Sequence, residues 1–259
     1  AWAWRKGRAK DCAKIADELV AIFPHELAPY EAAGANISFV GNPLVDTVRA
    51  ELPPEEARRH FGIADGEVPI LLMPGSRREE IERLLPAMLG AAKILSAADP
   101  ARRFFLPVAG GVDEERLAAH LAAASVPVML ARDARYALMG IARAAMATSG
   151  TVVMEAAIMG LPAVVLYRLS MLSYIVGRLL VDVERFSLPN ILLGETFETE
   201  LLQGDVEPRR IAAEMERIIR DGEDRSYVTE RLARAVACLG EKHAAHRVAE
   251  KIIALARRA

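Results

Sequence analysis

One stretch decides the fold of this chain: Leu71-Leu72-Met73-Pro74-Gly75-Ser76-Arg77-Arg78-Glu79-Glu80-Ile81. The apolar run 68–73 predicts a buried strand, and the pattern that follows predicts a helix directly behind it. The free N–H groups and the dipole of a first helical turn attract anions. Gly75 allows close backbone approach, Ser76 can cap the helix or donate to an oxyanion, and Arg77 adds a fork of donors. The junction therefore suits a phosphate or diphosphate, although a plain turn with a surface arginine fits equally well.

A second junction of the same kind lies farther along the chain. Residues 142–147 predict a strand, and a helix over 151–159 follows the turn Thr148-Ser149-Gly150-Thr151. Ser149, Gly150 and Thr151 can cap that helix or hold an anion. Glu155 lies one turn past Thr151, where its carboxylate can accept hydrogen bonds from ribose hydroxyls. A capping-box partner of Thr151 or a solvent-facing glutamate is the more common role for such a residue.

The rest of the central region repeats the alternation of strand and helix. Further strands are expected at 103–109, 127–130 and 162–167, and helices at 78–98, 113–124 and 133–139. Pro86 should kink or divide the first helix. Such alternation predicts an α/β fold, with a Rossmann-like parallel sheet covered by helices on both faces. Ligands of these sheets bind beyond the carboxyl ends of the strands, so both glycine-serine turns are expected at one crevice.

The flanking regions are predicted to be mostly helical. We expect a helix over 6–22, a short strand over 37–41 that ends at Asn42-Pro43, and helices from Pro208, over 226–239 and over 241–258. The apolar stretch 169–186 favours a core helix, and a partner-binding or membrane-surface helix stays open.

Composition indicates a globular protein and excludes several classes. The chain has 259 residues, of which 53% are hydrophobic and 26% charged, with a net charge of −2. No basic block suggests a nucleic-acid partner, and no cysteine-histidine cluster has metal-site spacing. Cys12 and Cys238 are expected to be reduced, as in a cytosolic protein. No apolar run is long enough to span a membrane. Because the sequence starts at Ala1 without methionine, we interpret it as a fragment, with a processed terminus as the alternative.

Seven motifs in a fixed order give the sequence a family resemblance. They are Trp2-Ala3-Trp4-Arg5, Phe23-Pro24-His25-Glu26, Phe39-Val40-Gly41-Asn42-Pro43-Leu44, Pro74-Gly75-Ser76-Arg77, Ser149-Gly150-Thr151 with Glu155, Leu188-Pro189-Asn190 and Glu200-Leu201-Leu202-Gln203. This order resembles the C-terminal two-thirds of the lipid-A-disaccharide synthases, which are inverting glycosyltransferases of the two-Rossmann-domain GT-B type. His25 and Asn42 depart from the family pattern, which usually has phenylalanine and histidine there.

The resemblance implies a domain organisation. Residues 1–45 would be the remnant of an N-terminal acceptor domain with its linker, and residues 46–240 the domain that binds the UDP-sugar donor. Residues 241–259 would form a helix that crosses back to the first domain, leaving an apolar face without a partner where that domain is missing. Exposed Trp2 and Trp4 would favour association or binding to a detergent surface.

The resemblance also implies an activity in lipid A biosynthesis for the Gram-negative outer membrane. UDP-2,3-diacylglucosamine would donate its sugar to 2,3-diacylglucosamine 1-phosphate, giving the disaccharide 1-phosphate and UDP. It adds Asn190 and Gln203 to the expected substrate-binding residues, although a turn residue and a surface glutamine are their plain interpretations. No metal or cofactor is expected, and no residue is assigned as the catalytic base, which belongs to the N-terminal domain.

Location and alternatives complete these expectations. The enzyme would be cytoplasmic with peripheral contact to the inner membrane, and a homodimer stays open. The fragment alone is expected to be inactive. The alternatives are an enzyme like UDP-N-acetylglucosamine 2-epimerase, which shares the fold, and a non-catalytic sugar-nucleotide-binding module.

Overall fold

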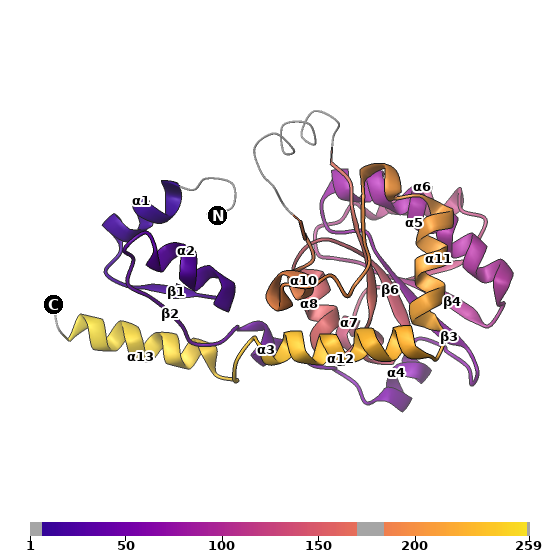
Figure 1. Ribbon diagram of the computed structural model, residues 1–259. Coiled ribbons are helices and arrows are strands. Elements are labelled where there is room, and N and C mark those ends of the chain that lie inside the picture. The colour runs from indigo at the N-terminus through magenta and orange to yellow at the C-terminus, as the bar shows by residue number, and fades with distance from the viewer. Residues whose placement is uncertain (1–6, 170–183, 258–259) are drawn as a thin grey trace.

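The computed structural model describes residues 7–169 and 184–257 (Figure 1). Its centre is a six-stranded sheet in the order β5-β4-β3-β6-β7-β8, and every neighbouring pair is parallel. The strands are β3 Val68–Met73, β4 Arg102–Pro107, β5 Val128–Ala131, β6 Ala144–Thr148, β7 Ala163–Tyr167 and β8 Glu200–Leu202. The chain moves outward from β3 to β5 and then returns to the other side of β3. The strand order therefore reverses between β3 and β6, where doubly wound sheets form their ligand crevice.

Helices cover both faces of this sheet, as the apolar strand runs predicted. They are α4 Pro54–His60, α5 Arg78–Ala98, α6 Glu114–Ala122, α7 Arg135–Ile141, α8 Thr151–Ile158, α10 Leu188–Leu193, α11 Pro208–Ile219 and α12 Glu223–Ala237, with a 3-10 turn η2 at Gln203–Asp205. Within β3, Ile70 and Leu72 belong to the core that contains α5 and α11, whereas Leu71 and Met73 belong to the core that contains α7. Successive side chains of a strand point to opposite faces, so a strand buried on both sides must be apolar throughout.

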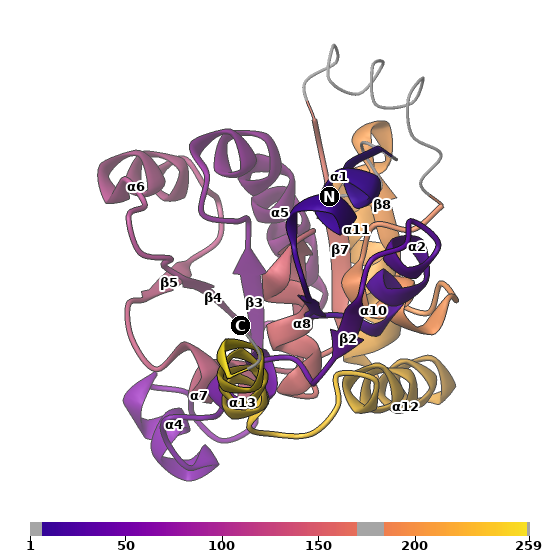
Figure 2. The ribbon, with the colours of Figure 1, turned by 90° about the vertical axis from the view of Figure 1, so that its left-hand side faces the viewer.

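Residues 7–39 form a smaller unit beside the sheet (Figures 1 and 2). It contains α1 Gly7–Ile15, β1 Leu19–Ala21, a 3-10 turn η1 at Pro24–Glu26, α2 Leu27–Glu31 and β2 Ile37–Phe39. The expected helix over 6–22 is wrong beyond Ile15, because residues 19–21 pair in parallel with β2. This pairing partner is distant in sequence, and tertiary context overrides local helix propensity there.

The C-terminal helix α13, Ala244–Ala256, lies against that smaller unit (Figure 2). Arg247 donates from Nε to the Val40 carbonyl at 2.7 Å, and Lys251 pairs with Glu18. Asp46, in the short helix α3 Leu44–Thr47, accepts the backbone N–H groups of His243 and Ala244 at 2.7 and 3.1 Å. Two isoleucines of α13 stay largely exposed, Ile252 at 61% and Ile253 at 52%.

Most expected elements of the central region are present, with three differences. The segment around Asn190, interpreted as a turn, is the short helix α10. Pro86 does not divide α5, which is one helix of 21 residues. Leu84, Leu85 and Met88 are almost fully buried around the proline, and this packing offsets the lost hydrogen bond. Strand β8 was not predicted, because three residues are too few for a periodic pattern.

Some expectations fall outside the described residues. They concern Trp2, Trp4 and nearly all of the apolar stretch 169–186. Within 7–169 and 184–257, no helix is long and apolar enough to cross a lipid bilayer.

Candidate functional site

A cavity of about 440 Å³ opens over the carboxyl ends of β3, β4 and β6, where the strand order reverses. This volume falls in the range of small-molecule sites. Seven residues expected to bind substrate line it together: Gly75, Ser76, Arg77, Ser149, Gly150, Thr151 and Glu155. The two strand-turn-helix junctions, more than 70 residues apart in sequence, therefore converge on one space, because parallel strands end at the same edge of a sheet.

The first junction combines a strained glycine with an arginine in solvent. Gly75 has φ +109°, and a Cβ there would lie 2.3 Å from Glu80 Oε2. Arg77 is the N-cap of α5, so Ser76 does not cap this helix. Glu80 accepts from the Arg77 backbone N–H at 3.3 Å and from Nη1 at 2.8 Å, while the Arg77 side chain is 83% exposed. Glu80 thus pairs with the backbone N–H and the guanidinium of Arg77, and a phosphate bound at this junction would compete with that carboxylate.

At the second junction the serine side chain bonds to the protein's own backbone, and several backbone N–H groups stay free. Ser149 donates from Oγ to the Phe186 carbonyl at 2.7 Å. Gly150 is the N-cap of α8, and the exposed Thr151 is its first residue. The backbone N–H groups of Gly150, Thr151 and Val152 have no acceptor among the described residues. Free donors at a helix N-terminus that opens into a cavity suit an anionic ligand.

Glu155 lies in the cavity wall and faces an arginine that the sequence interpretation missed. Arg135 Nη2 lies 3.5 Å from Glu155 Oε2, and its guanidinium stacks on the Tyr136 ring at 4.6 Å from the centroid. Burial raises the pKa of the Glu155 carboxyl, and Arg135 opposes this shift. The capping-box alternative is wrong, because the cap of α8 makes no side-chain hydrogen bond. Arg135 could have been found as a charged residue just beyond the end of a third predicted strand.

Asn190 and Gln203 are not brought to this cavity. Asn190 is fully buried in α10, where Nδ2 donates to the Glu198 carbonyl and to Glu200 Oε1, and Oδ1 accepts from Phe197 and Glu198 N–H groups. Gln203 has φ +53°, and its Oε1 accepts the Leu169 N–H at 2.7 Å. Both side chains hold segments of their own chain in this structure, and their proposed contact with substrate stays a prediction.

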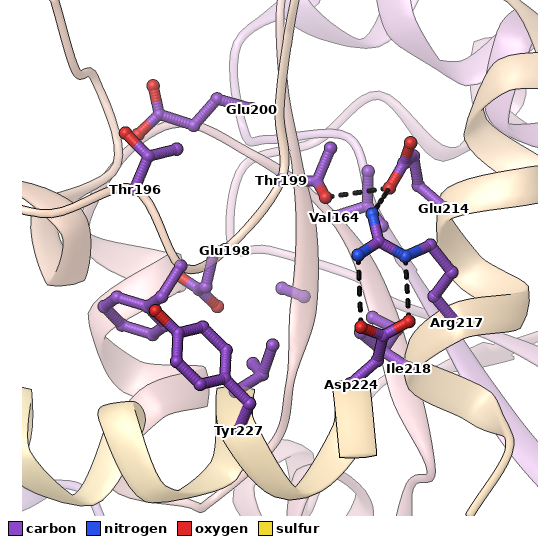
Figure 3. Close-up of a pocket in the computed structure, with 13 residues that line it drawn as sticks. Val164, Thr196, Glu198, Thr199, Glu200, Glu214, Arg217, Ile218, Asp224 and Tyr227 are labelled. Carbon is purple, nitrogen blue, oxygen red and sulfur yellow. Dashed lines mark hydrogen bonds and ion pairs between the residues drawn. The ribbon is translucent and has the colours of Figure 1, made fainter. Parts of the chain in front are cut away.

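A second cavity, of about 370 Å³, lies where β7 and β8 begin, at the opposite edge of the sheet (Figure 3). Its arginine, Arg217, is bound by Asp224 at 3.0 Å and by Glu214 at 2.9 Å. Glu214 also accepts from Thr199. Two carboxylates neutralise Arg217, whereas the exposed Arg77 pairs with one, so this cavity is the less suited of the two to a phosphate.

Comparison with known proteins decides the family. The model of the lipid-A-disaccharide synthetase family matches residues 1–254. The chain belongs to this family. It is 40% identical over 255 residues to a lipid-A-disaccharide synthase of Syntrophus aciditrophicus, and 38% identical over 254 residues to one of Trichlorobacter lovleyi. Each alignment covers 98% of this chain but only 67% and 66% of the relative, so the chain spans about two thirds of the length of these family members.

Solved structures confirm the GT-B type of α/β fold. The UDP-GlcNAc 2-epimerase of Neisseria meningitidis matches with a TM-score of 0.66 at 15% identity, over 93% of this chain and 62% of that one. WaaG, a glycosyltransferase of lipopolysaccharide biosynthesis, matches with a TM-score of 0.51 at 12% identity, over 85% of this chain and 58% of that one. At such identities the likeness concerns the fold alone.

Proposed function

We propose that this chain is the donor-binding part of a lipid-A-disaccharide synthase. The reaction would transfer the sugar of UDP-2,3-diacylglucosamine to the 6-hydroxyl of 2,3-diacylglucosamine 1-phosphate. The bond from the anomeric carbon to the UDP oxygen breaks, a bond to the acceptor oxygen forms with inversion, the proton of the acceptor hydroxyl passes to a general base, and UDP leaves. The observation that carries the proposal is the convergence of both glycine-serine junctions, Arg77 and Glu155 on one cavity at the point of strand reversal.

The residues of the cavity match the parts of a nucleotide sugar. Negative charge grows on the diphosphate as the sugar leaves, so preorganised donors there stabilise the transition state. Arg77 and the free N–H groups at the start of α8 supply such donors. Glu155 would accept the ribose hydroxyls, and Arg135 would add positive charge beside it.

The proposed division of the chain follows from this assignment. Residues 46–240 would form the donor domain, 1–45 would belong to the acceptor side, and 241–259 would link the two. We assign no catalytic base. The enzyme would work at the cytoplasmic face of the inner membrane, where its acylated substrates lie.

The test separates binding from turnover. Calorimetry with UDP should show weak binding by the 259-residue chain, because half of a two-domain cleft neither excludes water nor orients the donor fully. With both lipid substrates, no UDP should be released. Absence of UDP binding would overturn the donor-site proposal, and turnover by the chain alone would show that it contains the base.

Two further assays address the alternatives. A chimera that adds the part of the Syntrophus relative not covered by this chain should release UDP, whereas a non-catalytic module would not. Incubation with UDP-GlcNAc should give no epimer, and formation of the 2-epimer would favour the epimerase-like alternative.

A further inference from the structure

A half-buried carboxylate outside the candidate cavity holds the start of α10. Glu200, the first residue of β8, accepts the Phe186 N–H at 2.9 Å through Oε2. Its Oε1 accepts the Ser187 N–H at 2.9 Å and Asn190 Nδ2 at 2.7 Å. Three short charge-assisted bonds fix a carboxylate and its partners far more rigidly than a single neutral bond would.

The segment held by Glu200 is also the one that contacts the nucleotide site. The carbonyl of Phe186 accepts the hydroxyl of Ser149 at 2.7 Å. The N–H and C=O groups of Phe186 therefore connect Glu200 on one side with Ser149 on the other. The Phe186 ring packs on Tyr167 with centroids 5.8 Å apart, so this residue has little freedom to shift.

Asn190 belongs to the same network and strengthens it. Its amide joins Glu200 to the backbone of residues 197–198, which lead into β8. Both amide hydrogens of Asn190 are donated and its amide oxygen accepts twice, and such satisfied polar groups rigidify a protein interior. Asn190 and Glu200 are thus joined by a hydrogen bond, although neither lines the candidate cavity.

We infer that Glu200 is a positioning residue for the nucleotide site: it fixes Phe186, and through the Ser149 hydroxyl it sets the turn Ser149-Gly150-Thr151. The effect on a ligand rests on the proposed function, whereas the effect on the turn itself does not. Loss of the Glu200 carboxylate should loosen the turn and weaken the binding of a diphosphate there.

The experiment compares two variants in the same segment, each with one glutamate replaced by glutamine. Glu200→Gln keeps the shape but turns an amide NH₂ toward backbone donors. Glu198→Gln is the matched control, because Glu198 accepts the Ser187 hydroxyl and the Ala163 backbone N–H but no N–H of residues 186–187. In the unliganded chain, hydrogen exchange at the hydrogen-bonded amides of the turn, Ser149 (to the Leu166 carbonyl) and Val153 (to the Gly150 carbonyl), should speed up about tenfold in Glu200→Gln and stay unchanged in Glu198→Gln.

Binding of UDP provides the second readout. Glu200→Gln and Ser149→Ala should each lower the affinity for UDP about tenfold, and the double variant should be no weaker than either alone, because both changes cut one connection. If Glu200→Gln does not fold, Glu200→Asp is measured in the same way, since its shorter carboxylate cannot span the same donors.

The outcomes separate the two proposals. A lower melting temperature with unchanged exchange at the amides of Ser149 and Val153 and unchanged UDP affinity would show that Glu200 is merely structural. Additive losses in the double variant would overturn the connection through Ser149. If the unmodified chain binds no UDP, the proposed function fails, and the exchange comparison still decides whether Glu200 positions the turn.

Discussion

Arg135 and Glu155 face each other across the candidate nucleotide cavity, with Nη2 and Oε2 3.5 Å apart. This distance is long for a charge-assisted hydrogen bond, so the pair leaves the carboxylate able to accept further donors. The guanidinium of Arg135 stacks on the Tyr136 ring, and its positive charge favours the ionised form of Glu155. A ribose bound here would therefore meet a carboxylate that an arginine already orients.

Glu155→Gln tests that carboxylate. The affinity for UDP should fall about tenfold, because a ribose hydroxyl loses a charged acceptor. Thermal stability should change little, since burial already disfavours the charged form and raises its pKa. Calorimetry and a melting curve of the same variant give both numbers. Glu79→Gln, which removes an exposed partner of Arg83, is the control. Stability lost at unchanged affinity would reduce Glu155 to a structural residue.

Arg77→Ala tests the cation at the first junction. Charge-assisted hydrogen bonds contribute about 1.5–3 kcal/mol, so UDP should bind roughly tenfold or more weakly. Arg78→Ala is a matched control, because Arg78 follows directly in the chain, is also exposed and pairs with Glu82 outside this cavity. Titrations of both variants with UDP should separate them. Equal binding by Arg77→Ala and the unmodified chain would exclude the assigned role.

The buried Glu198 should make stability depend on pH. Burial raises the pKa of Glu198 to about 8, whereas the unfolded value is 4.5. The folded state then holds a proton that the unfolded state releases, so stability is fully present below pH 4.5 and is lost as pH rises toward 8. Between these two pH values the free energy of unfolding falls by about 1.4 kcal/mol per pH unit for one such group.

Urea unfolding of the unmodified chain and of Glu198→Gln from pH 5 to pH 8 measures this contribution. The difference in unfolding free energy should grow with pH in favour of the variant, because glutamine carries no charge into the interior. Parallel curves for the two proteins would show that Glu198 titrates alike in both states.

Binding of UDP should not require a divalent metal. Arg77 and the free N–H groups at the start of α8 line the cavity in which we propose the diphosphate binds, and the sequence has no Asp-x-Asp pair near it. The affinity for UDP should be the same with a chelator and with added Mg²⁺ or Mn²⁺. An affinity that collapses in the chelator and returns with either metal would contradict this.

Local patterns were enough to predict the framework of the site. The apolar run before Gly75 and the small-residue run before Ser149 each predicted a strand, and each following turn predicted a helix start. Since consecutive strands of such units run parallel, their turns had to lie at one edge. The sequence alone therefore predicted that both junctions converge.

The partners of individual side chains depended on the tertiary structure. The pairing of Arg135 with Glu155, of Ser149 with Phe186 and of Asn190 with Glu200 joins residues on separate elements. The strand β1 escaped prediction for the same reason, since it exists only through its pairing with β2.

The sequence by itself thus determined the α/β alternation and the two junctions that open toward an anion, because these follow from periodicity and from residues adjacent in the chain. The family resemblance rested on the order of seven motifs. Only the tertiary structure decided that Asn190 and Gln203 hold their own chain while Arg135 enters the cavity. The physical reason is that a polar side chain bonds to whatever donor or acceptor the packing of distant elements brings within about 3 Å, and no local pattern records that distance.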